Sequence, residues 1–131
     1  MKANNLRVDS AAIEAGEWVK NIPGCEDLEI QARGFNCSAF QDLQAKKLAA
    51  LSVAEKKDKG TAERIFNECV AEVCLMDLRN YTAADGTDIP VDQARAMALE
   101  PDRVPFLNAI KWAAGHVSRI RAEDEADAEK N

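Results

Sequence analysis

Four cysteines and one histidine are among the side chains of this chain that could carry out nucleophilic or metal chemistry. A thiolate beside an imidazole can act as a catalytic nucleophile, and the same two groups bind zinc. The C-x2-C step of zinc knuckles does not occur, and no catalytic signature surrounds His116. We therefore expect no enzyme, no catalytic residue, no cofactor and no metal ion. The cysteines are Cys25, Cys37, Cys69 and Cys74. We expect them to be reduced thiols with a structural role, and a metal site is the alternative interpretation.

The remaining motifs point away from phosphate, calcium, nucleic-acid and membrane binding. No Gly-rich phosphate loop occurs, and Asp85-Gly86-Thr87-Asp88 lacks the ladder of oxygen ligands and the closing Glu of a calcium loop. The 131 residues carry 17 Lys and Arg against 23 Asp and Glu, a formal net charge of −6. This is the wrong sign for a nucleic-acid footprint, and no apolar run approaches the roughly 20 residues that span a bilayer. We expect neither nucleic acid nor a membrane as a partner.

Period-two alternation predicts a β-hairpin near the N-terminus, at about residues 17–33. Apolar and polar residues alternate over 28–33, and the preceding Pro23-Gly24 pair is turn chemistry. A short helix before the hairpin is expected to be capped by Asp9 or Ser10 and to end at Gly16. This hairpin is the only strand signal that the sequence gives clearly.

Helical spacing of apolar residues dominates the rest of the chain. One helix is expected from about residue 38 to Gly60. The next, from Thr61 to about Arg79, is expected to be central because its apolar stripe is wide. After a loop with an Asp-Gly tip, helices are expected over 91–99 and from Asp102, which can cap the last one. The residues of the last helix expected to face inward are Phe106, Leu107, Ile110, Ala114 and Val117, with Ile120 as a further candidate.

The predicted fold class is mainly α. We expect a small helical domain of about four to five helices, with the N-terminal β-hairpin, over residues 1–121. Residues 122–131 are rich in Glu and Asp and are expected to form a disordered acidic tail or linker. The length fits one domain, and neither an internal repeat nor a second domain is expected.

Trp18, Ile22 and Trp112 are the candidate residues of a partner interface, because aromatic side chains dominate interface hot spots. Trp112 lies off the apolar stripe of its helix, so its ring is a candidate for exposure. Trp18 either anchors a partner or covers the helix layer from the hairpin, and we prefer the second interpretation.

The linear order of these features resembles the tail assembly chaperones of long non-contractile-tailed, lambda-like bacteriophages. The similarity covers about residues 16–115, and its motifs are a hairpin with Gly-x-Trp, an Arg-Gly exit and a Gly-Thr-Asp-Ile-Pro lead into a helix. The matching segments are Gly16–Val19, Ile22–Gly24, Leu28–Gly34, Val73–Leu78, Asp85–Gly86, Asp88–Val91 and Phe106–Ile110.

The resemblance implies a non-enzymatic protein of the host bacterial cytoplasm that is absent from the mature virion. Its implied partners are the tape measure protein, which it coats and keeps soluble, and the major tail tube protein, which polymerises around the tape measure. It further implies a homo-oligomer and a longer form of the same protein made by ribosomal frameshifting. Glu129-Lys130 can be encoded by a run of adenines on which ribosomes slip, and the four cysteines have no counterpart in this account.

Two other classes of protein stay open at this stage. A structural head–tail connector or tail terminator subunit would remain in purified particles, whereas a chaperone would not. A small acidic cytoplasmic regulatory protein would bind a defined basic target and would not form long assemblies. An enzyme would need His116 or one of the cysteines to matter.

Overall fold

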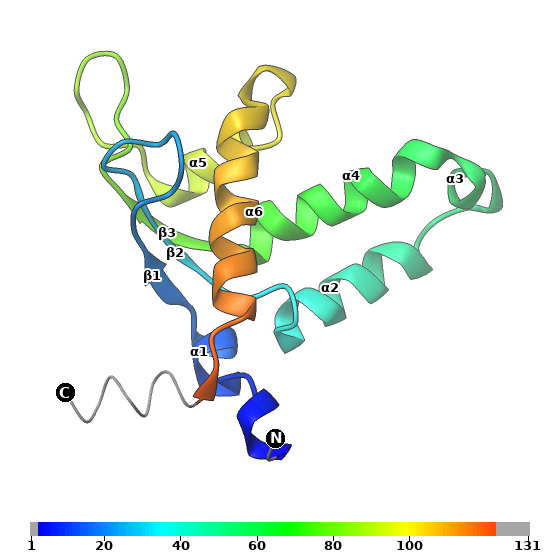
Figure 1. Ribbon diagram of the computed structural model, residues 1–131. Helices are drawn as coiled ribbons and strands as arrows, with labels where there is room; N and C mark the ends of the chain where they lie inside the picture. The colour runs from blue at the N-terminus through cyan, green and yellow to red at the C-terminus, as the bar shows by residue number, and fades with distance from the viewer. Residues whose placement is uncertain (1–2, 123–131) are drawn as a thin grey trace.

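The computed structural model describes residues 3–122 and has two layers, a small sheet and the helices packed on it (Figure 1). The acidic tail expected over 122–131 lies outside the described residues from residue 123 onward. Within the described part the fold is a small mixed α/β domain rather than a mainly α one. The elements in chain order are a 3-10 turn Ala3–Leu6, α1 Ser10–Ala15, β1 Glu17–Val19, β2 Glu29–Ala32, α2 Ser38–Ala49, α3 Val53–Lys57, α4 Lys59–Cys69, a π-helical turn Val70–Cys74, β3 Leu75–Arg79, α5 Val91–Met97, a 3-10 turn Pro101–Arg103 and α6 Val104–Ser118.

The sheet contains the expected hairpin and a strand that the sequence did not predict. The strand order is β1-β2-β3 and both pairings are antiparallel, so β2 is central. The prediction of a helix as far as Arg79 was wrong, because the helical path ends in the π-turn and the chain continues as β3. Ala32 pairs with Leu75 and Ile30 with Leu78, so a bulge adds one residue to β3. The two leucines are therefore three positions apart, which is the spacing of a helix face.

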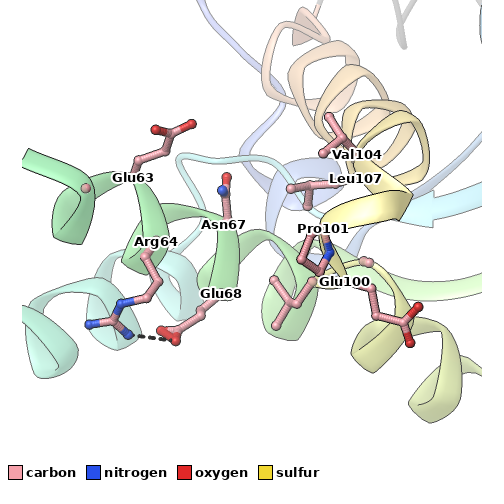
Figure 2. A pocket seen from close by; sticks show the side chains of 11 residues that line it. Glu63, Arg64, Asn67, Glu68, Glu100, Pro101, Val104 and Leu107 are labelled. Carbon is pink, nitrogen blue, oxygen red and sulfur yellow. Dashed lines mark hydrogen bonds and ion pairs between the residues drawn. The ribbon is translucent and has the colours of Figure 1, made fainter.

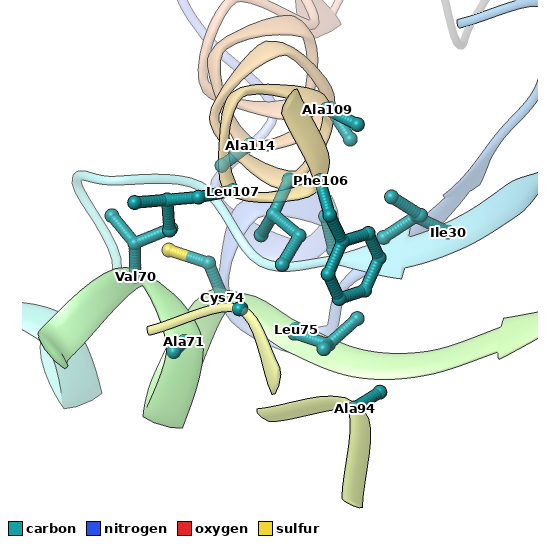
Figure 3. Packing of buried hydrophobic residues seen from close by; sticks show 14 of the residues in the cluster. Ile30, Val70, Ala71, Cys74, Leu75, Ala94, Phe106, Leu107, Ala109 and Ala114 are labelled. Atoms are coloured by element: carbon teal, nitrogen blue, oxygen red, sulfur yellow. The ribbon is translucent and has the colours of Figure 1, made fainter. Parts of the chain in front are cut away.

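The core lies between the sheet and α6, which crosses it (Figures 1 and 3). The inward face of α6 is the predicted one, since Phe106, Leu107, Ile110, Ala114 and Val117 are all buried. They pack with Ile30 of β2, Leu75 of β3 and the π-turn residues Val70 and Cys74 in a single cluster. Ile120 lies beyond the end of the helix and is half-buried against the core. Asp102 does not cap α6; it lies in the 3-10 turn, and no side chain caps this helix.

Helices α2, α3 and α4 form an arm that projects from the body (Figure 1), and we use "the arm" for residues 38–69. The single helix expected from residue 38 to Gly60 is interrupted, because Ser52 and Glu55 form a capping box that begins α3. Asp58 then caps α4 by accepting a hydrogen bond from the Gly60 nitrogen. Gly60 thus lies in the first turn of α4 rather than at a helix end, and Thr61 is buried inside the helix.

The short elements at the ends of the domain follow their capping signals. Asp9 accepts a hydrogen bond from the Ala12 nitrogen at the start of α1, and Gly16 ends that helix with φ +88°. The loop tip at Asp85-Gly86 is closed by a hydrogen bond from the Ala83 nitrogen to the Thr87 oxygen. Pro90 precedes α5 as expected. Local signals in the sequence therefore mark the bounds of α1, the loop tip and the start of α5, although no side chain caps α5.

Candidate binding surfaces

The three predicted interface residues lie in different environments and are not brought together. Trp112 is 40% exposed on α6, and its ring is stacked on His116 with the centroids 5.8 Å apart. Ile22 is 3% exposed and belongs to the core, so it offers no surface in this conformation. Trp18 precedes the buried Val19, so it points to the face of the sheet away from α6.

Trp18 does not cover the helix layer, and this corrects the interpretation preferred from the sequence. Its half-buried ring lies beneath the guanidinium group of Arg79, whose Cζ is 3.7 Å from the ring centroid. The two residues belong to opposite edge strands, β1 and β3. The ring therefore spans the outer face of the sheet as a cation–π partner.

An open groove lies between α4 and the corner that joins α5 to α6, and we call it the α4–α6 groove (Figure 2). Its volume is about 470 Å³. On the corner side, Leu99 and Val104 are large apolar residues with 42% and 49% of their surface exposed. On the α4 side, Glu63, Arg64 and Glu68 are polar, and Arg64 pairs with Glu68 at 3.0 Å. The corner side also carries Glu100, which pairs with Arg103. The groove thus has one mainly apolar wall and one charged wall.

Asn67 lies on the α4 side of this groove (Figure 2). Its side-chain oxygen is buried and has no hydrogen-bond partner among the described residues. A buried acceptor without a donor costs free energy. Asn67 therefore marks a locally unfavourable point on the charged wall of the groove.

An exposed stripe on α6 continues from the groove. Val104, Asn108, Trp112 and His116 follow each other at intervals of four and are all exposed, so they share one face of the helix. Sequence reasoning found Trp112 but missed Leu99 and Val104. The spacing between Val104 and Trp112 was the signal that could have identified the stripe.

A second concavity lies between the hairpin turn, the start of the loop after β3 and the beginning of α6, with a volume of about 440 Å³. We call it the acidic pocket. Its apolar floor includes Leu28 and the stacked rings of Tyr81 and Phe106, whose centroids are 4.4 Å apart. Three carboxylates that make no ion pair within the described residues line it: Glu26, Asp27 and Asp102.

Two further features shape the charge and backbone of the acidic pocket. Its basic lining residue, Arg103, is paired with Glu100 at 3.0 Å, so the unpaired charge of the lining is negative. Glu26 has φ +51°, in the left-handed region that residues other than glycine, asparagine and aspartate rarely adopt. The hairpin turn thus holds this carboxylate at the pocket at a cost in backbone strain.

The four cysteine thiols are free, and three of them are part of the packed interior. Cys37, Cys69 and Cys74 are buried, whereas Cys25 is partly exposed in the hairpin turn, and none forms a disulfide. Burial raises the pKa of the Cys74 thiol, and the neighbouring Cys37 and Cys69 raise it further. The Cys37 sulfur accepts a hydrogen bond from the Phe40 nitrogen and so caps α2. Residues 3–122 contain no cluster of His, Cys, Asp and Glu that could hold a metal ion.

Comparison with known protein families gives a match over most of the chain. The sequence model of a family described as YdaY prophage protein matches residues 36–131. No curated protein and no solved structure matches the chain. Among the described helices, none has the length and apolar character needed to cross a membrane.

Proposed function

The chain belongs to the YdaY prophage protein family, and from this premise we propose that it is a bacteriophage tail assembly chaperone. In this role it binds the tape measure protein in the host bacterial cytoplasm, without catalysis, while tail tube subunits polymerise around that protein. It leaves before the virion is mature. A longer form of the same chain, made by frameshifting, belongs to the proposal.

The observation that carries the proposal is the apolar surface formed by the α4–α6 groove and the stripe on α6. Leu99, Val104 and Trp112 are each at least 40% exposed. Leu99 and Val104 line the groove, and Trp112 lies about two turns along α6 from Val104. An amphipathic helix presents apolar residues at intervals of three and four, which fits a groove lined on one side by such residues. The charged wall on α4 would meet the polar flank of that helix.

A shallow and open surface suits a chaperone of a very long client. Each copy would cover a short apolar segment weakly, and many copies along one client would together keep it soluble. Release is then simple, because each contact is weak and tail tube subunits can displace the copies one after another. A deep enclosed binding site would hold the client more tightly and would slow the displacement of the copies by tail tube subunits.

The test is co-expression with the tape measure protein of the same phage. The wild-type chain is expected to raise the soluble fraction of the tape measure protein, and Val104→Asp is expected to lose most of this effect. Leu6→Asp is the matched control, because Leu6 is 67% exposed and lies in the N-terminal 3-10 turn, away from the groove. If the wild-type chain leaves the client insoluble, or if both variants act alike, the groove is not the client site.

Purified virions distinguish this proposal from a connector or tail terminator. A chaperone is expected to be absent from mature particles when they are probed with an antibody to this chain. A stoichiometric band in the particles would contradict the proposal and would favour a structural subunit.

A further inference from the structure

The tip of the arm is unusually exposed and carries a small excess of positive charge. Every residue from Leu48 to Gly60 is exposed except Leu51, and Val53 has 71% of its surface exposed. Lys56, Lys57 and Lys59 follow it in the chain and make no ion pair within the described residues. The two carboxylates of the same segment, Glu55 and Asp58, accept hydrogen bonds from the backbone nitrogens of Ser52 and Gly60. The tip thus presents an exposed apolar side chain beside three lysines, with an excess of positive over negative charge.

The acidic pocket has the complementary character. Its floor is apolar, through Leu28, Tyr81 and Phe106, and its rim carries the unpaired carboxylates of Glu26 and Asp27 together with Asp102. An isolated negative pocket or an isolated positive tip would indicate little. Here one chain carries both, each with exposed or accessible apolar residues, and with charge of opposite sign in excess, lysines at the tip and carboxylates at the pocket.

We propose that the arm tip of one copy docks into the acidic pocket of a second copy of this chain. Val53 then covers the apolar floor, and the three tip lysines meet the three rim carboxylates. The contact buries apolar surface at its centre and leaves the charges at its edge, which is the usual anatomy of a protein interface.

The positions of the two surfaces determine what kind of assembly follows. Figure 1 shows α3 at one end of the molecule and the hairpin turn, with the loop after β3, at the other. Tip and pocket are different surfaces, so the contact is heterologous, and every copy can donate a tip and accept one. Copies therefore join head to tail, into rows or, if the rotation between neighbours closes, into rings. This does not depend on what the α4–α6 groove binds.

The test uses the wild-type chain and two charge-reversal variants in sedimentation velocity. The sedimentation coefficient of the wild-type chain is expected to rise with concentration. Lys56→Glu/Lys57→Glu reverses the tip, and Glu26→Lys/Asp27→Lys reverses the pocket. Each variant alone is expected to lose at least about tenfold in association constant, while circular dichroism confirms that it is folded.

Mixing the two variants is the decisive step. The reversed tip of one variant then faces the reversed pocket of the other, and the two unmodified surfaces still match, so the mixture is expected to assemble again. A folding defect in either variant cannot produce this rescue. Raising the salt to about 1 M should weaken both the wild-type and the rescued assemblies, because exposed charges are screened.

The apolar part of the contact has its own matched pair of variants. Val53→Ser is expected to weaken association. Leu6→Ser is the matched control, because the two side chains have similar exposure, 71% and 67%. It is expected to leave association unchanged, because Leu6 lies outside the tip and the pocket. The proposal is overturned if the wild-type chain stays monomeric at all concentrations. It is equally overturned if the reversed variants assemble like the wild type, or if their mixture shows no rescue.

Discussion

The Glu14 carboxylate accepts two hydrogen bonds from Ser38, one from its nitrogen at 2.8 Å and one from its hydroxyl at 2.7 Å. Glu14 belongs to α1, and Ser38 is the first residue of the arm. The contact therefore ties the N-terminal helix to the point where the arm leaves the body. The bond from the Ser38 hydroxyl is the main reason why the pKa of Glu14 lies below its ordinary value of 4.5, and the bond from the Ser38 nitrogen is the second.

This carboxylate makes stability depend on pH in the acidic range. Because the pKa is lower in the folded chain, the contribution is complete above pH 4.5 and is lost as the pH falls through the folded value. Glu14→Gln should therefore flatten the fall of unfolding free energy between about pH 5 and about pH 3, as measured by urea denaturation. Glu17→Gln, at a neighbouring exposed carboxylate, is the control. If the unfolding free energy of the Glu14 variant fell with pH as steeply as that of the wild type, this account would be contradicted.

The hairpin turn should become more stable when its left-handed residue is replaced by glycine. Glu26 has φ +51°, and glycine adopts this conformation without steric cost. Glu26→Gly is expected to raise the free energy of unfolding by about 1 kcal/mol in urea denaturation. The comparison variant is Glu63→Gly in α4, which should lower it by about 1 kcal/mol, since glycine is unfavourable inside a helix. Destabilisation by both changes would show that the Glu26 conformation is not strained.

Thiol reactivity should separate Cys25 from the other cysteines. Cys25 is the partly exposed thiol, whereas burial excludes reagents from Cys37, Cys69 and Cys74 and raises the pKa values of the last two. At about pH 8, a disulfide reagent should titrate one thiol quickly in the folded chain and all four after denaturation. Cys25→Ser should abolish the fast phase. A second fast thiol in the native protein would mean that the base of the arm opens readily.

Removing the unpaired amide in the α4–α6 groove should stabilise the monomer. Asn67→Leu replaces a buried oxygen without a partner by an apolar side chain, and an increase of about 1 kcal/mol in unfolding free energy is expected. Asn108→Leu, at an exposed position of α6, should change it by less than about 0.5 kcal/mol. Destabilisation in the Asn67 variant would indicate that the amide has a partner in solution, such as an ordered water molecule.

The parts of the fold that follow from local chemistry could be predicted from the sequence. The caps of α1, the β1–β2 hairpin, the loop around Gly86, the start of α5 and the inward face of α6 all depend on residues close in the chain. The break between α2 and α4 was also predictable in principle, since Ser52 and Glu55 have the spacing of a capping box.

Strand β3 was not predictable in the same way. Its pairing partner, β2, lies more than 40 positions earlier in the chain, and the bulge gives Leu75 and Leu78 the spacing of a helix. The exposed stripe on α6 and the acidic pocket were harder still to predict from the sequence. Trp112 could be identified because it lies off the apolar face of α6. The acidic pocket could not, because its residues come from three separate segments that only tertiary packing brings together.

The arm leaves and re-enters the sheet at almost the same place, because Ala32 of β2 pairs directly with Leu75 of β3. Residues 41–60, its outer part, contribute no fully buried side chain. The arm is thus an insertion whose ends are held by the sheet, and the body does not constrain its length. Adding or removing helical turns there would alter the spacing between neighbouring copies in a row and little else, so the repeat distance of an assembly could change during evolution while the core stays the same.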